Sequence, residues 1–304
     1  MAAKTNVTTS AQFTTSAREV DFVSRFSDNW DALRNIMGIM RPIRKAPGTK
    51  LVSYKASVDG GLKGGTVDEG DEIPFTKMKV EPVAYGDIDI SKYAKSVTIE
   101  SVAKYGADVA VEKTDEAFLV ALQNKVLTDF YTFLGTGTLK VTEKTWQRAL
   151  AMAKGKVLDK FAGLDKDVTE VVGFANIIDA YDYLGDKEIT VQTMFGINYV
   201  ENFMGYRTLF LLPEKYIASK KVIALPVENI DLYYVDPSDS DFAKLGLNYT
   251  VKGETNLIGV HVDGDYSRAT GDMYAIMGMK LWAEYLDGIA VATVQADTGK
   301  AATV

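Results

Sequence analysis

The feature that most limits what this chain can fold into is a long hairpin pattern over residues 51–85. Two strand-like segments, residues 51–58 and residues 73–80, flank a glycine-rich stretch. The alternation slips between Phe75 and Met78, which predicts a bulge, and prolines in the returning segment are tolerated only on an edge strand. A two-stranded ribbon is barely stable alone in water. The hairpin therefore needs a surface to lie on, either in its own domain or on another subunit.

The turn of this hairpin combines glycines with acidic residues. Glycines at positions 60, 61, 64 and 65 could cradle a phosphate, but neither nucleotide-binding glycine pattern is present and no helix begins directly after them. The acids that follow could act as an acid–base pair or meet basic residues of a neighbour: Asp68, Glu69, Asp71 and Glu72. We interpret the glycines as a flexible loop tip and the acids as a solvated hairpin end.

The segment before the hairpin predicts an arm and a helix. Residues 1–20 are rich in Thr, Ser and Ala, which is typical of a flexible terminus. Apolar residues then recur at helical spacing from Phe22 to Met37, and Pro42 ends that pattern. This helix is expected to dock either on its own core or, as part of the arm, on a neighbouring subunit.

The clearest helix in the sequence runs from Asp115 to Leu134. Thr114 is the expected N-cap, and Gly135 stands where a C-terminal stop belongs. Its apolar residues form one broad face: Phe118, Leu119, Leu122, Val126, Phe130, Phe133 and Leu134. At 1.5 Å per residue such a helix spans about 30 Å, so we expect it to organise a core.

Mixed α/β patterns fill the rest of the chain. Alternation predicts strand at residues 87–90 and 97–100, before the long helix, and residues 135–138 resemble a linker after it. Helices are expected at 146–161 and 177–184. Strands are expected at 171–174, 208–213, 221–225, 230–235, 258–262, 274–279 and 289–294.

Composition excludes several classes of function. The chain has no cysteine, which excludes disulfides, thiol nucleophiles and cysteine-ligated zinc. Its net charge of −7, with Arg41, Arg44 and Lys45 as the only basic concentration, disfavours dedicated nucleic-acid binding. The first residues contain no apolar core of a signal peptide, and no stretch approaches the roughly 20 apolar residues that span a bilayer. We therefore expect a soluble protein that is made in the cytoplasm and does not bind membranes.

The residues that could carry chemistry have simpler explanations. The single histidine, His261, alternates with apolar neighbours as in a strand, and no Gly-x-Ser-x-Gly elbow accompanies it. Asp236, Asp239 and Asp241 could bind calcium, but their spacing departs from the helix-loop-helix calcium signature. We interpret His261 as structural and the aspartates as a solvated loop, and we predict no catalytic residue, no cofactor and no metal.

The order of these elements resembles the Hong Kong 97-type fold of tailed-bacteriophage major capsid proteins. The most similar local sequence runs from Glu72 to Phe75, through Tyr105-Gly106, into residues 118–135. In that family the hairpin is the E-loop, the long helix is the spine of the peripheral domain, and the α/β region is the axial domain. The resemblance implies an α+β fold with approximate parts: an N-terminal arm (1–46), the E-loop hairpin (47–86), the peripheral domain (87–138), the axial domain (139–256) and a return to the peripheral domain (257–304).

The resemblance also implies a function. Pentamers and hexamers of one chain tile an icosahedral shell in the virion, which encloses DNA without sequence-specific binding, and such a chain is not an enzyme. The implied partners are further copies, a portal and decoration proteins, and because only residues 1–46 precede the hairpin we expect a separate scaffolding protein. Some members join subunits by an isopeptide bond from an E-loop lysine to an asparagine. Lys63 could donate, but no asparagine follows Asn256, so no crosslink is expected.

Position in this pattern suggests which residues lie at contacts between subunits. These are Tyr54, Lys63 and Phe75 on the hairpin, with Trp30, Arg41 and Arg44 on the arm. Two other functions stay open: an encapsulin-like compartment shell, which shares the fold and packages enzyme cargo, and a mixed α/β hydrolase or sugar-binding protein. The Thr- and Ser-rich arm favours a virion, because encapsulins usually begin with a short cargo-binding helix.

Overall fold

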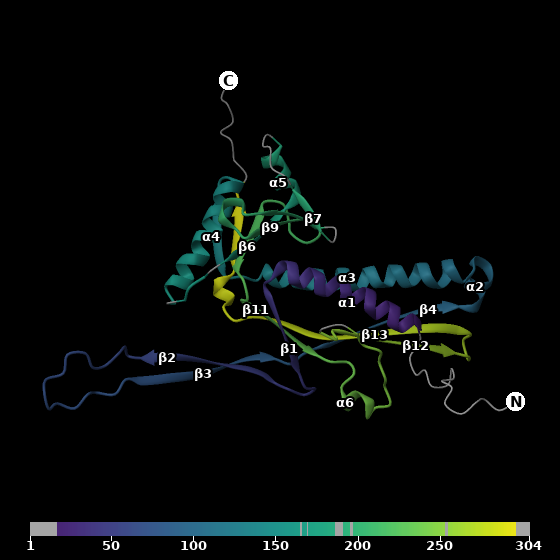
Figure 1. The fold of residues 1–304 in the computed structure, drawn as a ribbon, viewed down its shortest axis with the longest axis horizontal. Coiled ribbons are helices and arrows are strands. Elements are labelled where there is room, and N and C mark those ends of the chain that lie inside the picture. Colours follow the sequence, from purple (N-terminus) through teal and green to yellow (C-terminus); the bar gives the residue numbers. More distant parts are fainter. Residues whose placement is uncertain are drawn as a thin grey trace, which may run out of the picture.

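The long helix of the sequence lies beside the N-terminal helix on one face of a five-stranded sheet, and this unit forms the horizontal body in Figure 1. The two helices are α3 (Lys113–Leu134) and α1 (Ala17–Met37). The computed structural model describes residues 17–295, except residues 165, 169, 186–190, 195–196 and 253–254.

The five-stranded sheet is built around one long strand, β13 (Thr270–Ala283). Antiparallel β4 (Ile90–Thr98) lies on one side of it, and β12 (Ile258–Asp265) followed by β11 (Ile230–Val235) lies on the other. An edge strand, β1 (Met40–Lys45), runs parallel to β11. Alternate β13 residues, Met273, Ala275 and Met277, are buried toward the helices and join their apolar faces in one core.

A seven-stranded sheet forms the upright part of the molecule in Figure 1. Its strands are β5 (Leu139–Glu143), β14 (Ala290–Val294), β10 (Lys221–Pro226), β6 (Val171–Asn176), β9 (Thr208–Leu212), β8 (Ile197–Glu201) and β7 (Gln192–Met194), in spatial order. The helices α4 (Trp146–Ala162) and α5 (Ile177–Leu184) pack on it, and Thr145 caps α4 by accepting a hydrogen bond from the Arg148 N–H. Both helices lie where their apolar periodicity predicts them.

Three connections after α3 carry the chain between the two halves: residues 135–138, 227–229 and 284–289. The buried side chain of Asn229 joins two of these connections. Its amide Nδ2 donates to the Tyr285 carbonyl at 2.9 Å, and its Oδ1 accepts from the Tyr285 N–H at 3.0 Å. The connection at residues 135–138 is linked to residues 284–289 by a hydrogen bond from the Thr138 N–H to the Leu286 carbonyl.

The hairpin projects from the body as a separate ribbon of β2 (Leu51–Asp59) and β3 (Lys77–Gly86) (Figure 1). Residues 73–76, expected in the returning strand, belong instead to the loop. The prediction of a bulge between Phe75 and Met78 is wrong. Strand pairing is regular from Val52 to Asp59, and the register shifts instead between Leu51 and Val52. The apparent break in alternation arose because these residues belong to the loop, where side chains need not alternate between the two faces of a strand.

The start of the spine helix also differs from the expectation. Residues 99–100 were expected in a strand, but Thr98 ends β4 and caps α2 (Ile99–Tyr105) by accepting from the Ser101 N–H. A π-helical turn (Asp108–Glu112) then continues directly into α3. Thr114 therefore lies inside a continuous helical path and is not an N-cap; its hydroxyl donates to the Ala110 carbonyl. Residues 87–89 lie outside β4.

Several segments lie in a different part of the fold from the one expected. Residues 17–45 of the expected arm are built into the body, because α1 packs on the sheet and β1 pairs with β11. Pro42, read as a break, lies in β1, where an edge position needs no donor from it. The strand β11 belongs to the five-stranded sheet and β14 to the seven-stranded one, the reverse of their expected placement. The arm residues 1–16 lie outside the described residues.

Candidate assembly surface

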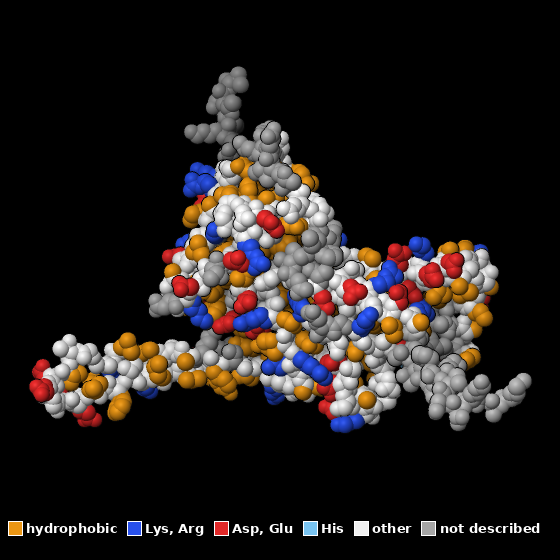
Figure 2. Space-filling view, in the orientation of Figure 1, with side chains coloured by type: hydrophobic (Ala, Val, Ile, Leu, Met, Phe, Trp, Pro, Cys, Tyr) orange, Lys and Arg blue, Asp and Glu red, His pale blue; other side chains and the backbone are white. Residues whose placement is uncertain are grey.

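The projecting hairpin has one apolar face, and that face is exposed. Directly opposed residues of an antiparallel pair point to the same side, and the opposed pairs on one side are all apolar: Val52–Ala84, Tyr54–Pro82, Ala56–Val80 and Val58–Met78. Tyr54 is 69% exposed, Met78 62% and Val80 58%. Figure 2 shows hydrophobic side chains along the whole ribbon. An apolar sheet face of this kind is normally buried.

The opposite face of the ribbon is polar and pairs its own charges. Lys77 Nζ lies 3.0 Å from Asp59 across the strands, and Lys79 lies against Glu81 along β3. These ion pairs are exposed and add little stability, as is usual at a surface. These charged side chains show which side of the ribbon remains in water, so the other, apolar side is the one available for packing.

The loop at the end of the hairpin, residues 60–76, is apolar and acidic at once. Phe75 is 89% exposed, Leu62 86% and Ile73 69%. The loop is closed by backbone contacts of Lys63, whose N–H donates to Thr76 Oγ1 at 3.0 Å while its carbonyl accepts from the same hydroxyl. Acidic side chains cluster at the tip in Figure 2. Phe75, expected on a strand, thus lies in the loop that these hydrogen bonds close.

The root of the hairpin is anchored to the body by a few contacts. Tyr85 stacks on Trp282 of β13 with a ring-centroid separation of 3.3 Å, and Leu51 is buried. Beyond Leu51, Val52 and the residues that follow it on the apolar face return to solvent. The chain therefore fixes the direction of the hairpin but leaves its apolar face without cover from the described part of its own body.

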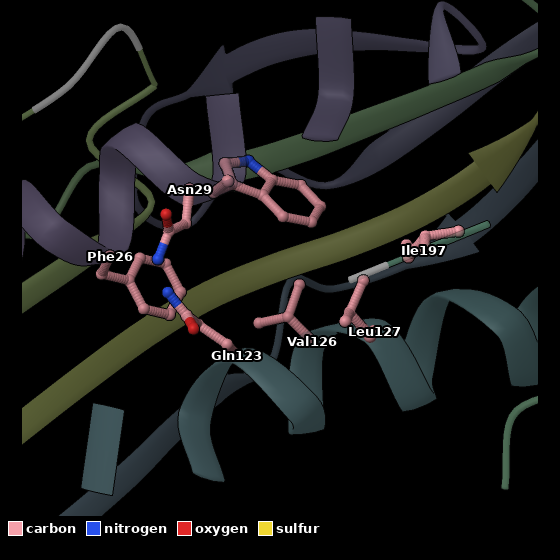
Figure 3. A pocket seen from close by; sticks show the side chains of 7 residues that line it. Phe26, Asn29, Gln123, Val126, Leu127 and Ile197 are labelled. Carbon is pink, nitrogen blue, oxygen red and sulfur yellow. The ribbon is translucent and has the colours of Figure 1, made fainter. Parts of the chain in front are cut away.

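Trp30, expected at a contact between subunits, belongs to the core of its own chain. It lies on α1 and is 5% exposed, with Phe22, Val23 and Phe26 buried on the same helix. Beside it a pocket of about 290 Å³ opens between α1 and α3. Figure 3 shows Asn29 of α1 and Gln123 of α3 facing each other across it. The helix thus docks on its own body, the simpler of the two alternatives that the sequence left open.

Arg41 and Arg44, also expected at contacts, have partners inside the chain. Arg41 Nε donates to Asp231 at 2.9 Å across the β1–β11 pairing, and Arg44 lies 3.3 Å from Asp236. Burial by itself raises the pKa of Asp236, but hydrogen bonds from Ser238 and other donors, together with Arg44, hold that pKa below its ordinary value. Both guanidinium groups remain about half exposed. Their visible role is to hold the edge strand to the sheet.

One charged cluster was not predicted from the sequence. Asp115, at the start of α3, accepts hydrogen bonds from Arg18 of α1, at 2.7 Å for Nη2, and is paired with Lys95 of β4. Burial alone raises the pKa of Asp115, but the hydrogen bonds from Arg18 and Lys95 outweigh it and hold the pKa below its ordinary value. The cluster joins two helices and a strand, so only the folded arrangement could reveal it.

The residues considered for chemistry have structural roles here. His261 Nδ1 lies 3.5 Å from buried Glu19, which also accepts from the Val262 N–H and from Thr250. Asp236, Asp239 and Asp241 do not converge, and no group of metal-binding side chains occurs among the described residues. Within the same residues, none of the helices has the length and apolar character to cross a membrane. The hairpin is therefore the feature of the described chain that most requires a partner.

Comparison with known proteins finds similarity of structure and not of sequence. No protein-family model matches the chain, and no curated protein resembles it. A structure of Gordonia phage Cozz aligns with a TM-score of 0.55 at 10% identity, covering 97% of this chain and 92% of that one. The bacteriophage PhiM1 mature capsid gives 0.54 at 7% identity, covering 85% and 86%. A virus-like particle from Pyrococcus furiosus gives 0.50 at 13% identity, covering 91% and 100%.

These alignments run over most of both chains, so they concern the whole architecture and not one shared motif. Their sequence identities are too low to carry residue roles, and the likeness is one of fold. The resemblance named a long spine helix, a projecting hairpin and a mixed α/β region, and the structure contains each of these elements. The chain has the α+β Hong Kong 97-type fold found in tailed-phage capsid proteins.

Proposed function

We propose that this chain is a major capsid protein, whose copies associate as pentamers and hexamers into an icosahedral shell around phage DNA. The observation that carries the proposal is the hairpin, which presents a continuous apolar face to solvent on a ribbon held away from its own core. A second copy is the simplest partner, because a surface repeated on every subunit can close into a symmetric assembly. The fold supports this function, since the PhiM1 structure of the same architecture is a mature capsid.

The proposal assigns different roles to the six residues expected at contacts. Tyr54, Lys63 and Phe75 lie on the exposed hairpin and are proposed to meet a neighbouring copy. Trp30, Arg41 and Arg44 have partners inside their own chain, so we assign them to the stability of the subunit. A net charge of −7 suits a shell that must not adhere to the DNA it encloses.

The proposed setting is the virion, after synthesis in the host cytoplasm. A separate scaffolding protein, a portal and decoration proteins are the partners that the fold suggests. The second candidate is a compartment shell that packages protein; the similarity to a virus-like particle from Pyrococcus furiosus supports a shell of either kind. Mass spectrometry of purified particles separates the two, because a capsid contains DNA and a compartment contains a co-packaged enzyme.

Microscopy of the purified chain tests the proposal directly. The chain is expressed alone and with a scaffolding protein, then examined by negative-stain microscopy and light scattering. We expect closed shells, tubes, or discrete pentamers and hexamers. A monodisperse species of 33.3 kDa under every condition would refute the shell function and favour the hydrolase or binding-protein alternative.

A further inference from the structure

The pocket beside Trp30 lies where α1, α3 and β8 meet, so it touches both halves of the molecule. Its volume of about 290 Å³ compares with about 150 Å³ for an engineered cavity that binds benzene. The pocket therefore has room for a molecule of two fused rings. Most of the side chains that line it are apolar: Phe26, Trp30, Val126, Leu127 and Ile197.

The rest of the lining is polar and uncharged. Asn29 is exposed to solvent, and it faces Gln123 across the pocket (Figure 3). Two of the lining residues hold buried N–H groups that have no acceptor among the described residues, Gln123 Nε2 and Trp30 Nε1. A buried donor without a partner lowers stability, and an acceptor that a ligand brings relieves this loss. Among the described residues, none that lines the pocket is acidic or basic, so an ionic ligand would lose its hydration without meeting a counter-charge.

We propose that this pocket binds a small, neutral, apolar molecule that carries a hydrogen-bond acceptor, such as a cyclic ketone, ester or ether. Its rings pack between the apolar side chains of α1 and α3, and its acceptor takes the hydrogen bond that Gln123 Nε2 offers. Water in the pocket can accept the same hydrogen bond, but it leaves the apolar side chains hydrated, and their burial is the main source of affinity in such sites. The site does not depend on the proposed shell function, because all of its residues belong to one chain.

A bound molecule would hold three elements together. It contacts the N-terminal helix, the spine helix and a strand of the seven-stranded sheet at once. A ligand that binds the folded chain and not the unfolded one raises the melting temperature. For a chain of 304 residues we expect a rise of about 2 °C at a tenfold excess over the dissociation constant.

Two probes of similar shape test the site: α-tetralone, which carries a ketone oxygen, and tetralin, which has no acceptor. The chain contains three tryptophans, Trp30, Trp146 and Trp282, so nitrogen-labelled protein gives three indole N–H signals in a proton–nitrogen NMR spectrum. Replacing each tryptophan in turn with phenylalanine assigns these signals. Each probe is titrated into the dissociated full-length chain. The Trp30 signal gives the dissociation constant, and the other two signals report non-specific binding.

We expect both probes to shift the Trp30 signal, with α-tetralone binding about three- to tenfold more tightly, since it adds one neutral hydrogen bond. Gln123→Met keeps the shape of the side chain but removes the donor, so it should abolish this preference and leave the binding of tetralin unchanged. Equal affinity for the two probes in the parent chain would overturn the class of ligand.

A second pair of variants tests the position of the site. Leu127→Trp fills the pocket and should block both probes, whereas Val120→Trp, at an exposed position of the same helix, should block neither. If Leu127→Trp does not fold, the comparison of parent and Gln123→Met decides alone. A Trp30 signal that neither probe moves, or shifts of equal size at all three tryptophans, would overturn the site.

Discussion

Polar substitution on one face of the hairpin should weaken assembly without weakening the subunit. The variant replaces Tyr54, Met78 and Val80 with threonine, which retains a high preference for strands. All three side chains are more than half exposed in the isolated chain. The stability of the subunit should therefore change little, whereas any contact that buries this face loses most of its apolar area.

The size of the effect follows from the exposed fractions. Complete burial of a large apolar side chain contributes about 1.5–3 kcal/mol. Only the exposed part, from 58% to 69% of each side chain, remains to be buried by a neighbour. Threonine keeps one methyl group, so each substitution removes about 1 kcal/mol and the three together about 3 kcal/mol per hairpin. The association constant of the contact should fall about a hundredfold.

Sedimentation over a range of chain concentrations measures the threshold for shell formation, and thermal unfolding of the dissociated subunit measures its stability. The matched control places three threonines on the polar face of the same ribbon, at Lys77, Lys79 and Glu81 of β3, where only exposed ion pairs are lost. The control should assemble nearly as the parent does. Equal loss in both variants, or assembly of the apolar-face variant at the parent's threshold, would show that the exposed apolar face is not what drives association.

Three further predictions concern the subunit and the loop. Asp115→Asn should lower the free energy of unfolding at neutral pH by about 2–4 kcal/mol, because two cations lose their shared carboxylate. The folded pKa of Asp115 lies below its unfolded value of about 3.9, so this stabilisation is present above about pH 4 and is lost as the pH falls through the folded pKa. Urea unfolding at several pH values should therefore show the unfolding free energies of the parent and the variant converging at low pH. Gly137→Ala places a Cβ 2.6 Å from the Ile289 carbonyl oxygen and should destabilise the subunit by about 1–3 kcal/mol. Gly155→Ala on α4 meets no atom within 4 Å and should stabilise that helix by about 0.5–1 kcal/mol. A lower melting temperature for both variants would contradict this. Deletion of residues 59–65 should leave a folded subunit by circular dichroism but few shells by microscopy, and particles like those of the parent would count against the hairpin's role.

Elements with a strong local signal were predictable from the sequence. The helix at residues 177–184 has the bounds expected from its periodicity, and the strand at 230–235 does too. The order of the elements was enough to suggest the fold. Elements that depend on distant partners were missed: β1 contains Pro42 and exists because β11 supplies an edge, and α2 begins inside an alternating pattern because Thr98 caps it.

The candidate surface was predicted in outline and not in detail. The sequence indicated a hairpin that needs a partner, and Tyr54 is among the residues that it exposes. The alternation of apolar residues from Val52 to Val58 was readable, but its match on β3 begins only at Met78 and was obscured by the apolar loop before it. Trp30 was misplaced because one aromatic residue on a helix looks the same whether it faces its own core or a neighbour.

The three connections between the two halves have a mechanical consequence. They run close together and are bonded to one another through Asn229, Tyr285 and Thr138, so a force that pulls the halves apart is divided among three backbones. Separation requires several hydrogen bonds to break together, and a single hinge cannot open first. Under internal pressure such a subunit should yield at its contacts with other copies before its own halves tear apart.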